Sequence, residues 1–170
     1  EFKEIEYVPA FIKIFDEILV NSSDHAIRTK KVNYIKVEIK DNVISVENDG
    51  DGIPVVVHKD HNIYVPEMIF GHLLTGENFN DADNRYVGGR NGIGGKATNI
   101  FSKEFIVETA DGKKSFKQVF TENMSKFTKP VTKKSSKNFT KITYTPDYKK
   151  FGMVGLDDIS YALMVKRVFD

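Results

Sequence analysis

Two tight turns, Asp41-Asn42 and Asp111-Gly112, constrain the fold of this chain more than any other feature of its sequence. Each turn separates two segments in which apolar and polar residues alternate, and these segments are 34–39, 43–47, 104–110 and 114–122. A period of two is typical of strands with one buried face, and a two-residue turn joins neighbouring antiparallel strands. The sequence therefore predicts two β-hairpins, and residues 141–145 predict a further strand.

Helical segments surround the hairpins. Pro9 suits the first turn of a helix, and the segments predicted to be helical are 9–28, 65–74, 96–102 and 157–169. The predicted loops are 48–54, a glycine-rich segment at 75–95, and a lysine- and serine-rich segment at 129–138. Helices combined with antiparallel hairpins predict an α+β fold. We expect a two-layer sandwich with helices on one face of a mixed, largely antiparallel sheet.

The composition limits the class of protein. A chain of 170 residues fits one domain, which would bury about 70% of the surface that its unfolded form exposes. The net charge of +1 gives no global attraction to nucleic acid or to a membrane. The absence of cysteine excludes disulfides and thiolate metal sites. No apolar run approaches the roughly 20 residues of a membrane-spanning helix.

The first candidate site stretch is Glu17-x-x-x-Asn21 in the predicted first helix. A spacing of four residues places both side chains on one face, one turn apart. A carboxylate can take a proton from water, and an amide oxygen is a ligand suited to magnesium. The alternative is a solvated polar face, although the apolar residues around this pair favour a packed helix.

The second candidate stretch is the loop from Asn48 to Gly52. Its two glycines allow the backbone to approach a flat ligand closely, and Asp49 offers a fixed acceptor that would suit an exocyclic amine such as that of adenine. The alternative is an ordinary turn after a hairpin. A calcium loop is excluded because further ligands and a closing glutamate are missing.

The third candidate stretch is YVGGRNGIGGKATNIF, residues 86–101. It is not a Walker A loop, because Arg90 stands where the first glycine is required and Ala97 where a hydroxyl is required. A dinucleotide fingerprint would follow a buried strand, whereas the preceding segment is polar. Backbone N–H groups of a glycine loop that leads into a helix can bind an anion, and Lys96 adds a positive charge. The alternative is a flexible linker.

The last two patterns are less specific. Thr140 and Thr143 in the final predicted strand could point a hydroxyl into a pocket, but threonine is also a good strand former. Five lysines form a basic segment that could bind nucleic acid, and they are Lys129, Lys133, Lys134, Lys137 and Lys141. No aromatic or arginine reader stands among them, so solvation alone also explains them.

In their order along the chain, the three candidate stretches and the threonine-containing strand resemble the Bergerat (GHKL) ATP-binding fold. Type II DNA topoisomerases, MutL-type mismatch-repair proteins, large heat-shock chaperones and sensor histidine kinases share this fold. The segments KIFDEILVN, VPEMIFGHLLT, GGRNGIGGK and TPDYKKFGM are similar to the ATPase region of eukaryotic-type DNA topoisomerase II, including the versions of large DNA viruses. We therefore expect residues 1–170 to be one GHKL ATPase domain of such an ATP-hydrolysing enzyme. Another GHKL ATPase, of the MutL or chaperone type, is the alternative.

The resemblance implies a role for each matching residue. Glu17 is expected to be the general base that activates the attacking water, and Asn21 to hold Mg²⁺. Asp49 is expected to receive the adenine amine, with Thr140 supporting a water beside it. The other residues expected to bind ATP are Gly52, Ile53, Asn78, Arg90, Asn91, Gly92, Ile93, Gly94, Gly95 and Lys96.

Two departures from the family pattern affect the surroundings of this site. The family usually reads LLTSSN where this chain reads LLTGEN, and RNGYGAK where it reads RNGIGGK. The expected catalytic residues are unchanged, but the ribose contacts and the lid differ. These departures favour a viral or a divergent protist source.

The resemblance also gives expectations for the intact protein. Family members dimerise on ATP binding through an N-terminal strap, and a transducer domain completes the site with a lysine. We recognise neither part here, nor a DNA-cleaving core, and expect the isolated chain to bind ATP but hydrolyse it poorly. The expected partners are DNA, through the full-length enzyme, and a second copy in a homodimer, with no membrane. The expected location is intracellular: the nucleus for a cellular source, or the host cytoplasm or nucleus for a virus.

Overall fold

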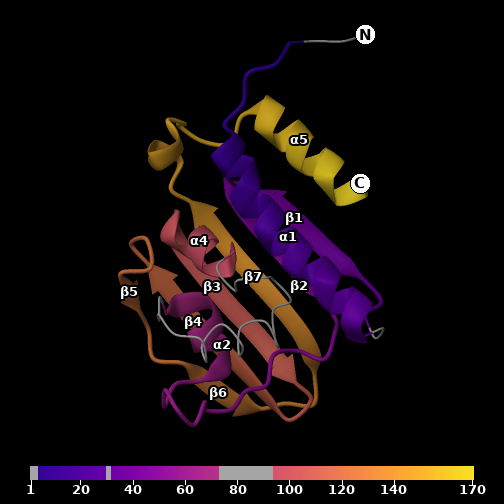
Figure 1. Cartoon of the computed structure of the whole chain (residues 1–170), viewed down its shortest axis with the longest axis vertical. Helices are drawn as coiled ribbons and strands as arrows, with labels where there is room; N and C mark the ends of the chain where they lie inside the picture. The colour runs from indigo at the N-terminus through magenta and orange to yellow at the C-terminus, as the bar shows by residue number, and fades with distance from the viewer. Residues whose placement is uncertain (1–3, 30–31, 73–93) are drawn as a thin grey trace.

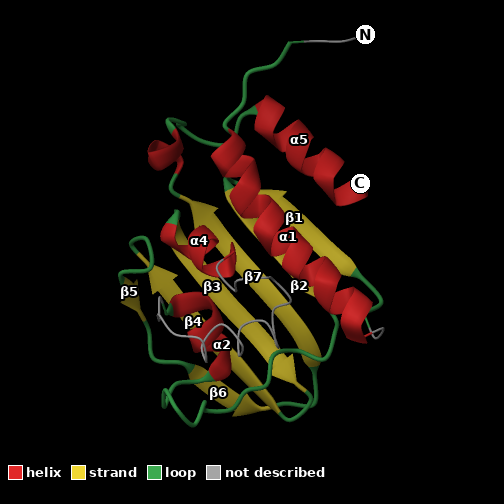
Figure 2. Ribbon diagram, viewed as in Figure 1, coloured by secondary structure: helices red, strands yellow, loops and turns green. Residues whose placement is uncertain are grey.

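The protein folds into two layers, a sheet and a set of helices that cover one of its faces (Figures 1 and 2). The structure, a computed structural model, describes residues 4–29, 32–72 and 94–170, and describes side chains in the first helix as far as Ser22. In these residues every strand pair is antiparallel. The predicted α+β sandwich is therefore confirmed, while the mixed character expected of the sheet is absent from the part that the structure describes.

Within the described residues, the sheet contains seven strands in the order β1-β2-β7-β3-β4-β5, with β6 also paired to β4. Their bounds are β1 Ile35–Lys40, β2 Val43–Asn48, β3 Ser102–Asp111, β4 Lys114–Thr121, β5 Lys126–Phe127, β6 Val131–Lys134 and β7 Asn138–Pro146. Both predicted hairpins are present as β1–β2 and β3–β4. The last strand, β7, lies between them and joins them into one sheet.

The first hairpin turn shows why its sequence is specific. Asp41 and Asn42 have φ values of 52° and 67°, which a two-residue turn of type I′ requires and which Asp and Asn tolerate better than other side chains do. In the second turn Gly112 has a φ of 88°. Local turn chemistry therefore fixes both hairpins.

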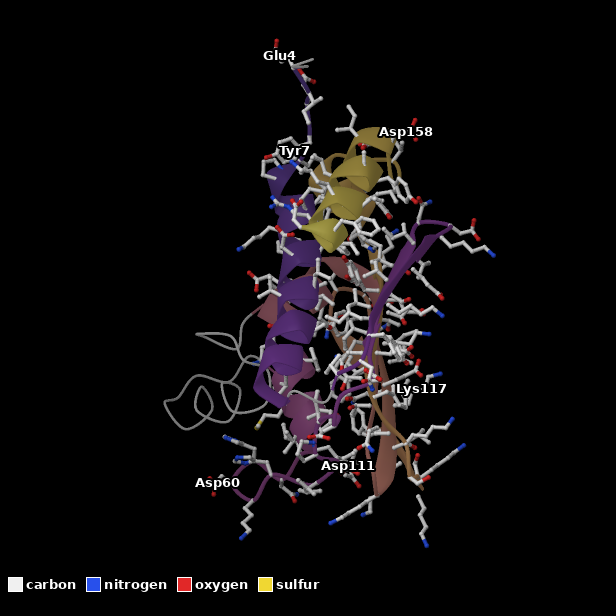
Figure 3. All side chains as sticks on the ribbon, turned by 90° about the vertical axis from the view of Figure 1, so that its right-hand side faces the viewer. Glu4, Tyr7, Asp60, Asp111, Lys117 and Asp158 are labelled. Carbon is white, nitrogen blue, oxygen red and sulfur yellow. The ribbon has the colours of Figure 1, made fainter. Side chains whose placement is uncertain are left out.

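The helices are α1 Pro9–Thr29, α2 Val65–Gly71, α4 Gly94–Ile100 and α5 Asp158–Phe169, and a short 3-10 helix covers Tyr148–Phe151. In α1 the apolar stripe that the periodicity predicted is buried, with Phe15 fully inaccessible. It packs on inward-facing residues of the central strands, and this core includes Ile44, Val46, Val107, Ile142 and Tyr144. The side view in Figure 3 shows the helices on one side and the sheet on the other.

Three predicted elements differ from the structure. The segment expected to be a lysine-rich loop contains β6, whose strand pattern three polar residues conceal. The helix α4 begins at Gly94, two residues before the predicted start, and Ser102 belongs to β3. The helix α2 ends at Gly71, before the predicted end at residue 74, and it is buried from Val65 to Phe70 because it packs against α4, β3 and β4.

Candidate functional site

Two residues predicted to belong to the site, Glu17 and Gly94, are in contact. Glu17 lies on α1, with 32% of its side chain exposed, and forms an ion pair with Lys13 at an Nζ–Oε1 distance of 3.1 Å. A methyl group added to Gly94 would overlap the Glu17 carboxylate. Because only glycine leaves room for this approach, the carboxylate lies directly against the first turn of α4.

Side chains of α4 fix it to its neighbours. Thr98 Oγ1 donates to the carbonyl oxygen of Ile14 in α1 at 2.9 Å, and Asn99 Nδ2 donates to that of Phe70 in α2 at 3.0 Å. Lys96 is only 2% exposed. These bonds between helices hold the candidate residues of α1 and α4 in one packed unit.

Gly95 and Asn21 lie in the same unit. A methyl group on Gly95 would lie 2.7 Å from Cδ1 of the buried Phe70 ring, so glycine is required there as well. Asn21 is half-buried, one turn beyond Glu17 on α1, and therefore shares its face of the helix.

A row of three polar residues crosses the central strands where β2 enters the following loop. Asn48 in β2 is the register partner of Thr140 in β7, which is in turn the partner of Thr109 in β3. All three alternate in phase with the buried apolar residues of their strands, so they point to the face that the helices cover. Asn48 is 3% exposed, Thr109 is fully buried, and Thr140 is half-buried.

The loop after Asn48 is bound to the end of β3. The backbone N–H of Ile53 donates to Thr109 Oγ1 at 2.9 Å, and that of Val55 donates to Asp111 Oδ2 at 2.9 Å. Gly52 has a φ of +80°, and a methyl group there would overlap the carbonyl oxygen of Ala110. The loop therefore depends on glycine for both its conformation and its close approach to the strand.

Asp111 contributes to this arrangement as a charged acceptor. Its other oxygen, Oδ1, accepts from the N–H groups of Lys113 and Lys114. Burial by itself raises the pKa of Asp111, but the N–H donors of Lys114, Val55 and Lys113 outweigh burial and lower the pKa below its usual value.

Asp49, the residue predicted to receive an adenine amine, makes its contacts with residues 33 and 34. Its carboxylate accepts from the N–H and side chain of Asn33 and from the N–H of Tyr34, at 2.8 to 3.1 Å. Burial raises the pKa of Asp49, but these donors outweigh it and lower the pKa. Asp49 follows Asn48 by one residue, and alternation turns it away from the row.

Asn48 and Thr109 are candidate site residues that the sequence interpretation did not single out. The signal for Asn48 was available in the strand parity, because Ile44, Val46 and Asn48 share one face of β2. The role of Thr109 required knowledge of which strand lies beside β7. The predicted residues Asn78, Arg90, Asn91, Gly92 and Ile93 lie outside the described residues.

A basic hollow of about 320 Å³ lies on the outer part of the sheet; we call it the lysine hollow. Its lining contains four lysines and one acidic residue, which are Lys117, Lys133, Lys134, Lys137 and Glu108. Figure 3 shows Lys117 on the side of the sheet away from the helices. Two of the five lysines considered for nucleic-acid binding, Lys129 and Lys141, do not line it.

Comparison with known proteins assigns the chain to a family. Residues 8–149 match the family described as histidine kinase-, DNA gyrase B-, and HSP90-like ATPase, and the chain belongs to this family. It is 54% identical over 174 residues to DNA topoisomerase 2 of Arabidopsis thaliana and 52% identical over 175 residues to that of Acanthamoeba polyphaga mimivirus. Each alignment covers 99% of this chain, but only 12% and 14% of the two relatives.

Solved structures support this family assignment. The ATPase region of Saccharomyces cerevisiae topoisomerase II matches with a TM-score of 0.88 and 44% identity, over 98% of this chain and 46% of that one. The ATPase domain of Thermus thermophilus gyrase B, with a TM-score of 0.71 and 24% identity, shares the fold. The fold and the family resemblance inferred from the motifs are confirmed. Among the described residues, no helix is long and apolar enough to cross a membrane.

Proposed function

We propose that this chain is the ATP-binding and ATP-hydrolysing domain of a type IIA DNA topoisomerase, in which it drives the passage of one DNA duplex through another. The observation that carries this proposal is the close similarity to DNA topoisomerase 2 along 99% of the chain. The contact between Glu17 and Gly94 supports it, because it sets a carboxylate against the segment expected to hold the phosphates. The comparisons do not favour the MutL-type or chaperone alternative.

On the phosphate side, Glu17 would act as the general base. Hydrolysis needs a water oriented toward the terminal phosphorus and an acceptor for its proton, and a carboxylate fixed on a packed helix can serve as that acceptor. The backbone of Gly94 and Gly95 and the ammonium group of Lys96 would stabilise the phosphate charge, together with Arg90, Asn91, Gly92 and Ile93.

On the base side, we assign the adenine amine to Asn48 in place of Asp49. Asn48 is buried within the polar row, and its Oδ1 accepts from the N–H of Gly50 at 3.0 Å and keeps a second lone pair. The Asp49 carboxylate already accepts three hydrogen bonds from residues 33 and 34. Thr140 lies beside Asn48 in the row. Gly52 and Ile53 would form the wall that packs against the base, and Asn78 would contact the ribose or phosphates.

Asn21 would hold Mg²⁺. An amide oxygen suits this hard cation, and the described residues contain no group of three acidic or histidine ligands that could bind a metal alone. This donor set fits an ion held mainly by phosphate oxygens and water. When bound, Mg²⁺ would neutralise phosphate charge.

The intact protein would act on DNA and would dimerise when ATP binds. A cellular source would place it in the nucleus, and a viral source in the cytoplasm or nucleus of the host. The isolated chain would bind ATP and turn it over slowly, since a lysine of the following domain would complete the site.

The test uses the full-length protein and its Glu17→Gln variant. We expect the native protein to relax supercoiled DNA only with ATP, and the variant to bind an ATP analogue normally while its hydrolysis falls at least about a hundredfold. ATP hydrolysis without any change in DNA topology would instead favour the MutL or chaperone alternative. Hydrolysis by the variant at the native rate would exclude Glu17 as the base.

A further inference from the structure

Thr109 is the most completely hydrogen-bonded side chain near the base side of the site. It is fully buried, and its Oγ1 has three partners at 2.9 Å: the N–H of Ile53, the carbonyl oxygen of Phe139, and the hydroxyl of Thr140. A threonine hydroxyl has one hydrogen to donate and two lone pairs to accept with. The three contacts therefore use its full capacity.

The partners also fix the direction of each bond. The Ile53 N–H can only donate and the Phe139 carbonyl can only accept, so the Thr109 hydrogen points to Phe139. All three contacts are then hydrogen bonds only if the Thr140 hydroxyl donates to Thr109. The hydrogen of Thr140 is thereby committed, and both of its remaining lone pairs are acceptors.

We propose that Thr109 is a positioning residue that sets the base selectivity of this site by holding the Thr140 hydroxyl as an acceptor. A group that bonds directly to the Thr140 hydroxyl must then be a donor, such as an amine. Adenine carries an amine at the position where guanine and hypoxanthine carry a carbonyl oxygen. This inference rests on the proposed ATP-binding function.

The same residue links two walls of the site. Through Ile53 it holds the loop that contains Gly52, and through Phe139 and Thr140 it holds β7. Without the Thr109 hydroxyl, the Thr140 hydroxyl could rotate and donate to a carbonyl on the base, so a 6-oxopurine would be rejected less strongly.

The test measures the affinities of the chain for the imidodiphosphate analogues of ATP and GTP with Mg²⁺, by calorimetry. Thr109→Val removes the hydroxyl and keeps the shape, Thr109→Ser keeps the hydroxyl, and Thr143→Val is the matched control on the other face of β7. We expect the adenine-to-guanine affinity ratio to fall about tenfold in Thr109→Val and to remain native in the other two variants.

Three outcomes would overturn the proposal. If Thr109→Val leaves the adenine-to-guanine affinity ratio unchanged, whether or not both affinities fall, Thr109 has only a structural role. If the native chain binds neither analogue, the proposed function fails first and takes this inference with it. Should Thr109→Val not fold, Thr109→Cys supplies a weaker acceptor of similar size, and an undiminished ratio in that variant would contradict the proposal.

Discussion

Single glycines decide how closely the parts of this site approach one another. Gly94 admits the Glu17 carboxylate, Gly52 admits the backbone of β3, and Gly95 admits the ring of Phe70. The sequence interpretation expected Gly94 and Gly95 to surround the phosphates and Gly52 to lie close to the adenine. The structure adds a packing reason for each of them, which a motif alone does not contain.

Replacing Gly95 by alanine, the residue that the resembling family usually carries there, should destabilise this chain. The added methyl would lie 2.7 Å from Phe70, whose ring packs against Phe105 at a centroid distance of 5.9 Å. We expect Gly95→Ala to lower the free energy of unfolding by about 1–3 kcal/mol, as overpacking in cores does. Urea unfolding provides the measurement.

The paired variant identifies the cause. Combining Gly95→Ala with Phe70→Leu should restore part of the loss, so that the double variant is more stable than the sum of the single effects implies. Strict additivity of the two changes would show that the methyl group does not press on the Phe70 ring.

Among the elements, the β3–β4 hairpin supports the site through its turn. Asp111 accepts one N–H from the Ile53–Val55 segment and two from its own turn. Hydrogen bonds to a carboxyl group are stronger while the group is ionised than when it is protonated. The stability of the hairpin and its attached loop should therefore depend on pH.

We predict that Asp111→Asn is less stable than the native chain by about 1–3 kcal/mol at pH 7. The folded-state pKa of Asp111 is lowered, so its contribution is present above the unfolded pKa of about 3.9 and is lost as pH falls through the folded pKa. The difference should therefore vanish in strong acid. Urea unfolding at pH 7 and near pH 2 tests this, with Asp60→Asn as control, and a pH-independent gap would contradict it.

The lysine hollow on β4, β6 and the start of β7 gives a prediction about DNA. Three lysines in this small region, Lys133, Lys134 and Lys137, should contact phosphates if the hollow lies along a duplex. Changing all three to alanine should weaken duplex binding and lower its salt slope by about 2–3. A triple Lys→Ala variant at Lys149, Lys150 and Lys166 is the charge-matched control, and equal losses in both variants would show that only net charge matters.

Most of the helices and strands could be predicted from the sequence. Turn residues and alternation located both hairpins, and the apolar periodicity located α1 and α5 to within a residue or two. β6 was missed because Val131 is followed by Thr132, Lys133 and Lys134, which leave no apolar alternation to detect. The polar row was missed because strand order, with β7 between β2 and β3, is a long-range property.

In the whole molecule, the helices cover one face of the sheet (Figure 1). The motifs alone gave the family and a set of candidate site residues, since their order along the chain follows the order of the elements that carry them. The base-side acceptor that we propose, Asn48, lies one residue before the one that the motif suggested. Successive residues of a strand point to opposite faces of the sheet. A motif therefore identifies the side chain that faces the site only if the alternation along the strand is followed.

The most direct measurement is a calorimetric titration of the chain with a non-hydrolysable ATP analogue and Mg²⁺, in native, Asn48→Ala and Asp49→Ala forms. Thermal unfolding would verify that each form is folded. We predict saturable one-to-one binding by the native chain, a loss of at least about tenfold in Asn48→Ala, and a change of less than about threefold in Asp49→Ala. No binding by the native chain would contradict the assignment as an ATP site, and a loss confined to Asp49→Ala would contradict the base-side geometry.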